Sequence, residues 1–258
     1  MDKISFQRLV LALSGVLIAL CTVVMGVHSL APPGPTIPTT APPGSSPSAA
    51  PPGSSIPPTA PSGNFFDDAA FVGDSVTLAL RNYHLKTGIL GNATFLCAGS
   101  FGVRHAVRED GIRLTFQGQP VSPQQALRDC GAKRVFLMLG MNDLAFGLEE
   151  TMAHWEQLLA NIRQSCPDVE IYIQSVTPVH RNFEGKKLNN ENLESYNAKL
   201  RSFAAKKGCF YIDVASQMKD GTGALAEQFC SDQKCNLTET AVQLWLEKLQ
   251  EVAWENGY

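Results

Sequence analysis

The chain has 258 residues, enough for one domain with a sizeable core, and it divides into parts of very different composition. Its 24 acidic and 21 basic side chains give a net charge of −3, and no segment gathers basic residues into a stripe. Nucleic acid is therefore excluded as an expected partner.

A long apolar run opens the chain. Residues 9–27 carry no charge, and their number is close to the ~20 residues that a helix needs to cross a bilayer. Basic residues lie on the short leading side, which favours a cytoplasmic N-terminus. A small-residue cleavage pattern ends at Ala31, but Pro32 follows it directly and disfavours removal as a signal peptide. We expect a cytoplasmic segment over residues 1–8, a transmembrane signal-anchor over residues 9–30, and an extracytoplasmic remainder on a single-pass cell-membrane protein.

Residues 31–63 hold most of the chain's 16 prolines and no charged residue. Imperfect Ala-Pro-Pro-Gly repeats start at Ala31, Ala41 and Ala50. A segment this rich in proline and this poor in large apolar side chains cannot bury a core, so we expect a disordered, extended linker. A ligand for a proline-binding domain is the alternative, and nothing else in the sequence favours it.

Residues 64–258 alternate short apolar runs with helical patterns, which predicts a single α/β domain. Strands are expected at 69–72, 93–98, 134–139, 169–176 and 209–214. Helices are expected at 78–83, 123–130, 148–165, 190–206 and 238–255. This alternation indicates a five-stranded parallel sheet covered on both faces, a three-layer α/β/α architecture. Ligands of such folds bind beyond the carboxyl ends of the strands.

Two motifs place reactive groups at these strand ends. Phe71-Val72-Gly73-Asp74-Ser75 is an apolar strand followed by a turn that presents a serine hydroxyl. A longer apolar strand, Val135–Leu139, is followed by Gly140-Met141-Asn142-Asp143 and delivers a carboxamide. A serine nucleophile and an amide donor for the oxyanion are what acyl transfer requires.

These two motifs, in this order, make residues 65–255 resemble the SGNH hydrolases, the GDSL esterase/lipase family. The resemblance implies a flavodoxin-like fold with Ser75 as the nucleophile. It also implies three oxyanion donors, which are the main-chain amides of Ser75 and Gly102 and the side chain of Asn142. Gly102 ends the run Cys97–Gly102, which is similar to the family's second block with cysteine in place of the usual asparagine. No metal ion or organic cofactor is implied.

The last block of the family is Asp-x-x-His, or a variant one residue longer, before a helix. The similar residues here are Asp232 and Asn236-Leu237-Thr238, so asparagine stands where the catalytic histidine is expected. Asparagine cannot take a proton near neutral pH and cannot activate Ser75. In a serine hydrolase, loss of the histidine lowers turnover by about 10⁶, while the oxyanion hole and binding leave ~10³–10⁴ over water.

Other residues offer alternative chemistry. Ala98-Gly99-Ser100-Phe101-Gly102 fits a relaxed nucleophile elbow with Ser100 attacking, but this interpretation leaves Gly140–Asp143 unexplained. His105 and His180 follow expected strand ends and are candidates for a displaced base. A surface or loop position is the expectation for both.

Six of the seven cysteines lie in the predicted domain. An extracytoplasmic location permits disulfides, and Cys230 with Cys235 is the only close pair. Cys97 and Cys209 lie in apolar runs and are expected to be buried free thiols. No spacing of cysteine and histidine resembles a zinc site.

The sequence therefore predicts a membrane-tethered esterase acting on a small acyl ester, for example an O-acetyl group on a cell-surface glycan. In this prediction Asp232 orients whatever base is present. The alternative is a domain that binds acylated glycan in the same crevice without turnover. Asn236 favours the alternative, and the presence of Ser75, Gly102 and Asn142 favours the enzyme.

Overall fold

The computed structural model describes residues 63–108 and 111–258. The predicted anchor and residues 31–62 of the predicted linker lie outside the described residues. Within the described part of the chain, no helix combines the length and the apolar character needed to span a membrane.

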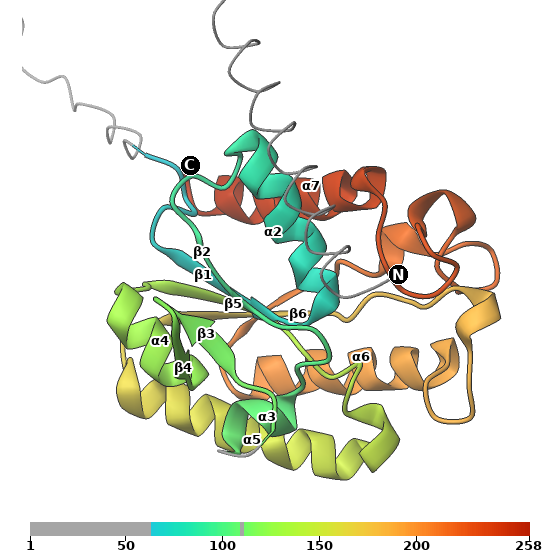
Figure 1. The fold of residues 1–258 in the computed structure, drawn as a ribbon, viewed down its shortest axis with the longest axis horizontal. Helices are drawn as coiled ribbons and strands as arrows, with labels where there is room; N and C mark the ends of the chain where they lie inside the picture. The colour runs from blue at the N-terminus through green and yellow to red at the C-terminus, as the bar shows by residue number, and fades with distance from the viewer. Residues whose placement is uncertain (1–62, 109–110) are drawn as a thin grey trace, which may run out of the picture. The chain divides into compact units, whose positions relative to one another are not determined.

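Five parallel strands form the central sheet, in the order β2-β1-β5-β6-β7 (Figure 1). Every strand expected from the sequence is present, with ends that differ by a few residues. This strand order is that of flavodoxin-like folds, in which the chain reverses direction across the sheet after the first two strands. The ligand crevice of such folds lies at this reversal, here between β1 and β5. The strands are β1 (Ala69–Gly73), β2 (Thr94–Cys97), β5 (Arg134–Met138), β6 (Glu170–Gln174) and β7 (Phe210–Ile212).

Helices cover both faces of the sheet, which confirms the three-layer architecture (Figure 1). One face carries α2 (Ser75–Thr87) and α7 (Glu239–Glu255), which pack against each other. The other face carries α3 (Val103–Val107), α4 (Pro123–Cys130), α5 (Leu148–Ser165) and α6 (Asn190–Lys206).

Helix α2 begins at Ser75 and not at the expected Leu78. Asp74 caps it, because the Asp74 carboxylate accepts a hydrogen bond from the Val76 amide at 2.9 Å. The helix ends at Gly88, whose φ of +67° is the left-handed conformation that glycine adopts most readily. The reactive serine therefore occupies the first turn of a helix.

Two elements were not expected from the sequence. One is the short helix α3, which follows Gly102 directly. The other is an antiparallel hairpin of β3 (Leu114–Phe116) and β4 (Gln119–Val121), whose turn residues both have positive φ.

A row of aromatic rings crosses the whole sheet, with one ring from each strand. Neighbouring rings stack with centroids 4.6 to 5.1 Å apart and planes 13 to 15° apart. Because the ring-bearing residues are also register partners, this row fixes how the five strands align and hence where their carboxyl ends lie. The ring-bearing residues are Phe95, Phe71, Phe136, Tyr172 and Phe210.

Candidate active site

Ser75 lies at the point where β1 passes into α2. The turn is tight, because a side chain at Gly73 would come within 1.8 Å of the Thr77 hydroxyl. Ser75 is partly exposed, and among the described residues nothing hydrogen-bonds to its hydroxyl or its amide. Amides in the first turn of a helix lack intrahelical acceptors and carry partial positive charge. The Ser75 hydroxyl and the Ser75 main-chain amide, which has no acceptor among the described residues, therefore lie side by side at the start of α2.

Asn142 links the turn of Ser75 to the turn of Gly102. Its Nδ2 donates to Asp74 Oδ2 at 2.8 Å and to the Phe101 carbonyl at 3.2 Å. Asp74 precedes Ser75, and Phe101 precedes Gly102. The loops that follow β1, β2 and β5 therefore meet at one carboxamide, although their catalytic roles stay predictions.

Asp143 holds the Gly102 turn from behind, a function that was not expected from the sequence. Its buried carboxylate accepts hydrogen bonds from the Val103 amide at 2.8 Å and the Arg104 amide at 3.1 Å. A side chain at Gly102 would come within 2.5 Å of this carboxylate, so glycine is needed there. The Gly-x-Asn-Asp motif thus supplies a predicted oxyanion donor and the group that positions its neighbour.

Gly140 is required by packing. Its φ is +124°, and a side chain there would come within 2.0 Å of the Tyr196 hydroxyl. That hydroxyl donates to the Leu139 carbonyl at 2.7 Å and accepts from the Trp155 indole at 2.7 Å. The end of β5 is therefore joined to α5 and α6 directly below the Asn142 turn.

The carboxyl groups of Asp74 and Asp143, which lie beside Asn142, both have raised pKa values. Burial raises the pKa of Asp74 to about 6, even though hydrogen bonds from Val76 and Asn142 favour its charged form. Burial also raises the pKa of Asp143, against the opposing effect of the Arg104 and Val103 amides. The first of these carboxyl groups changes charge just below neutral pH.

Two of the three expected oxyanion donors are engaged within the protein. The Gly102 amide donates to His105 Nδ1 at 3.0 Å, and the Asn142 Nδ2 donates to two acceptors. Only the Ser75 amide has no acceptor among the described residues. An oxyanion would therefore have to displace the His105 nitrogen and the more distant acceptor of Asn142, the Phe101 carbonyl.

The residues expected to carry the general base, Asp232 and Asn236, lie in a hairpin just before α7. Asn236 Nδ2 donates to Asp232 Oδ2 at 2.7 Å, while the main-chain amides of Lys234 and Asn236 donate to Asp232 Oδ1 at 2.9 and 3.2 Å. Partial burial opposes ionisation of Asp232, but these hydrogen bonds outweigh it and lower its pKa. Asn236 thus contacts the carboxylate as the expected histidine would, but with an amide that cannot accept a proton.

The hairpin approaches the nucleophile turn. Burial raises the pKa of the Cys235 thiol to about 11, and the negative charges of Asp232 and Asp74 add to the shift. The titration of Cys235 therefore responds to the charge of Asp74, the residue that precedes Ser75. Among the described residues, no hydrogen bond links Asn236 to Ser75.

His105 and His180 are both buried, so neither lies on the surface; His180 lies in a loop, as the alternative in that expectation had it, and His105 lies in α3. His180 Nδ1 accepts from the Asn182 amide at 3.1 Å, and its Nε2 lies 2.7 Å from Glu227 Oε2. His105 Nδ1 is engaged by Gly102. Neither histidine hydrogen-bonds to Ser75.

Ser100, the alternative nucleophile, lies in the turn after β2 with a φ of +57°. A positive φ is a feature of nucleophile elbows. However, β2 is the edge strand of the sheet, away from the reversal between β1 and β5. The helix after it begins at Val103 and not directly after the serine. The geometry favours Ser75.

All six cysteines of the described region are free and partly buried. In the same region, no group of three or more histidine, cysteine or acidic side chains gathers as a metal site would require.

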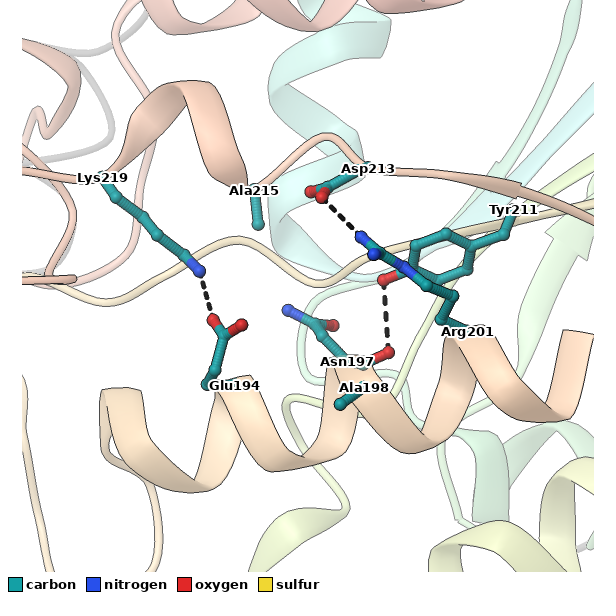
Figure 2. A pocket seen from close by; sticks show the side chains of 8 residues that line it. All are labelled: Glu194, Asn197, Ala198, Arg201, Tyr211, Asp213, Ala215 and Lys219. Carbon is teal, nitrogen blue, oxygen red and sulfur yellow. Dashed lines mark hydrogen bonds and ion pairs between the residues drawn. The ribbon is translucent and has the colours of Figure 1, made fainter.

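A small hollow beside β7 is lined by charged residues of α6 and of the loop after β7 (Figure 2). Its charges are paired within the protein, because Lys219 contacts Glu194 and Arg201 lies 2.7 Å from Asp213. With a volume of about 80 Å³ and no unpaired charge in its lining, this hollow offers little to a substrate.

The comparisons with known proteins agree with this geometry. Residues 69–240 match the model of the GDSL-like lipase/acylhydrolase family. No curated protein matches the sequence.

Three solved structures illustrate the similarity of fold. A GDSL-like lipase from Bacteroides thetaiotaomicron is 12% identical, with a TM-score of 0.59 over 74% of this chain and 89% of that one. A carbohydrate esterase family 3 protein from Talaromyces cellulolyticus is 11% identical, with a TM-score of 0.53 over 72% and 96%. The periplasmic domain of a lipopolysaccharide acetyltransferase from Salmonella ser. Paratyphi A is 12% identical, with a TM-score of 0.53 over 75% and 85%. With the family model covering most of the chain and the fold in agreement, this protein belongs to the GDSL-like lipase/acylhydrolase family.

Proposed function

We propose that this protein hydrolyses small acyl esters at Ser75, such as O-acetyl groups on a cell-surface glycan, while its N-terminal segment tethers it to the membrane. The observation that carries the proposal is the bonding of Asn142 to Asp74 and to Phe101. This carboxamide joins the three loops on which acyl transfer depends, at the reversal where ligands of this fold bind.

In this reaction the Ser75 oxygen attacks the ester carbonyl, and the alcohol leaves. The amides of Ser75 and Gly102 and the Asn142 side chain stabilise the negative oxygen. Water then hydrolyses the acyl-serine to release the acid. Because Asn236 cannot accept the serine proton, solvent must take it, so we expect slow turnover that rises with pH.

The choice of a glycan ester is supported by two neighbours of the same fold, which are a carbohydrate esterase and a lipopolysaccharide acetyltransferase. At 11 and 12% identity they indicate a class of substrate to test first.

A second candidate is a domain that binds acylated glycan without hydrolysing it. The observation that favours it is the hydrogen bond between Asn236 and Asp232, which occupies the expected position of the histidine–aspartate pair. Asp232 then orients an amide rather than a base.

Hydrolysis of p-nitrophenyl acetate by the full-length protein, alongside its Ser75→Ala variant, separates the two candidates. Turnover that disappears in Ser75→Ala supports the esterase. Equal rates in both proteins, together with binding of an acetylated oligosaccharide, would support the binding domain.

The tether is tested by expressing the full-length chain in a bacterial host. We expect the protein to fractionate with membranes and to keep its N-terminus, because Pro32 directly follows the small-residue cleavage pattern that ends at Ala31. A soluble form that begins near Pro32 would contradict the anchor.

A further inference from the structure

Two side chains that the proposed chemistry does not use lie next to the oxyanion donors. Arg104 follows Gly102 by two residues in α3, and Phe146 follows Asn142 in the turn Leu144–Phe146. The two segments are joined, because the Arg104 amide donates to Asp143 Oδ1 at 3.1 Å. Arg104 and Phe146 therefore belong to the two loops that border the Ser75 crevice beyond β2 and β5.

The Arg104 guanidinium lies over the Phe146 ring, with 4.4 Å between the guanidinium carbon and the ring centroid. Phe146 is 51% exposed, so part of its ring stays open to a ligand beside the guanidinium. The Arg104 Nε is buried and has no acceptor. Stacking on a ring leaves the donors at the edge of a guanidinium directed away from that ring, where a planar anion can meet them.

No carboxylate of the described residues forms an ion pair with Arg104. The nearest negative groups are committed elsewhere. Asp143 interacts with the Arg104 charge at longer range, but its oxygens accept the main-chain amides of Val103 and Arg104. Glu150 lies 3.6 Å from Arg108, one turn further along α3. Among the described residues, Arg104 is thus a cation stacked on an aromatic ring and without an ion-paired carboxylate.

A hollow of about 170 Å³ borders the same turn. It is lined by Leu144, Gly147 and Leu148 from the segment after Asn142 and by Lys187, Asn192 and Ser195 from α6 and the loop before it. Lys187 forms no ion pair with the described residues. The surroundings of the Phe146 turn therefore combine a recess, polar side chains and a second cation.

We propose that Arg104 and Phe146 form a subsite for a carboxylate-bearing sugar, so that the glycan acted on by Ser75 is acidic. The guanidinium donates paired hydrogen bonds to the sugar carboxylate, and the exposed part of the phenyl ring packs against the apolar face of the sugar. This inference rests on the proposed function, because it names the substrate class of the same crevice.

The test measures binding by isothermal titration calorimetry to the full-length protein carrying Ser75→Ala, so that no probe is consumed. The probes are an acetylated oligogalacturonide and an acetylated xylo-oligosaccharide of equal length, at low salt. We expect the acidic probe to bind about tenfold more tightly, as a charge-assisted hydrogen-bonded pair provides. The preference should shrink as salt is added.

Arg104→Gln should remove the preference for the acidic probe, while Arg104→Lys should keep only part of it, because lysine retains the charge without the planar fork. Arg108→Gln is the matched control at the residue that ends α3, and it should leave the preference intact because Arg108 already pairs with Glu150. Thermal unfolding of each variant identifies any loss of folding.

Three results would overturn the subsite: no binding of the acidic probe, equal binding of the two probes, or an acidic preference that survives Arg104→Gln. The proposed function is judged separately, by Ser75-dependent turnover of p-nitrophenyl acetate. A preference for the acidic probe without Ser75-dependent turnover would support the subsite and contradict the esterase. Turnover without that preference would support the esterase and contradict the subsite.

Discussion

The turns that carry Ser75, Gly102 and Asn142 differ from the hairpin that carries Asp232 and Asn236 in both burial and bonding. In the first region two buried carboxylates, Asp74 and Asp143, connect segments that are far apart in sequence. In the second region Asp232 bonds to residues two and four positions along the chain, and Asn236 is exposed. One region is built by the whole fold, and the other by a short local loop.

This difference predicts different responses to mutation. A change in the first region alters several loops at once, because each carboxylate holds more than one of them. A change at the exposed hairpin alters only local contacts, and exposed positions usually tolerate substitution within a fraction of a kcal/mol. The expected base position is therefore the place where function can change without loss of the fold.

The largest expected effect is a gain of activity in Asn236→His. An imidazole at this position would be oriented by Asp232, and general-base assistance typically contributes 10²–10⁴, so an increase of tenfold or more in Ser75-dependent hydrolysis of p-nitrophenyl acetate is expected. Asn236→Gln is the matched control, because it changes the side chain without adding a base.

Addition of Asp232→Asn to the Asn236→His variant should reduce the gain, since the imidazole would lose its orienting carboxylate. If the wild type is already as fast as Asn236→His, another base is at work, and His105→Ala and His180→Ala identify it.

Asp143→Asn tests the buried region and should lower turnover by roughly 10² in the Asn236→His background. The amide can accept only one of the Val103 and Arg104 hydrogen bonds, so the Gly102 donor moves, and a displacement of this kind costs about 10². Unchanged kcat in a folded Asp143→Asn protein would show that the Gly102 turn does not depend on this carboxylate.

Asp74 should make stability depend on pH. Folding raises the pKa of Asp74 from 3.8 to about 6, so the folded state binds a proton more tightly than the unfolded state does. This preference adds to the free energy of unfolding. The added stability is fully present below pH 3.8 and is lost as the pH rises through 6. Relative to Asp74→Asn, the wild type should lose about 2 kcal/mol of unfolding free energy between pH 4 and pH 7, most of the shift that the change in pKa allows. Denaturant titrations at the two pH values measure this difference, and parallel changes in both proteins would argue against it.

The smallest effect is expected at the surface contact between the two regions. Lys86 of α2 pairs with Glu239, the first residue of α7, and both side chains are about two-thirds exposed (65 and 64%). Glu239→Gln should lower the free energy of unfolding by less than about 1 kcal/mol, since exposed ion pairs contribute little. A larger loss in denaturant titration would mean that the hairpin depends on this contact for its position.

The sequence predicted the parallel sheet and the bounds of α4, α5 and α6 because apolar periodicity is a local signal. It did not predict the hairpin of β3 and β4, whose strands have three residues each and include Pro120. Nor did it predict α3, which has five residues and begins at a glycine without a capping side chain. Elements this short carry too little periodicity to be recognised.

The candidate residues of the site were named from their motifs and their roles stay predictions, while their environment could not be predicted. His105 and His180 look like loop histidines in the sequence, and only the packed structure shows them buried and bonded. Asp143 was visible in the Gly-x-Asn-Asp motif, yet its partners Val103 and Arg104 lie 40 and 39 residues away in the chain. Burial and long-range bonding arise from the tertiary fold, which no local pattern records.

The contact between Gly140 and the Tyr196 hydroxyl has a consequence for how such proteins are recognised in genome surveys. Only glycine fits this position, whether or not the domain turns over a substrate. The glycine of the Gly-x-Asn-Asp signature is therefore required by the fold, and selection for a folded protein alone would preserve it. A survey that counts esterases by this signature will therefore also collect any relative that has kept the fold without the catalysis.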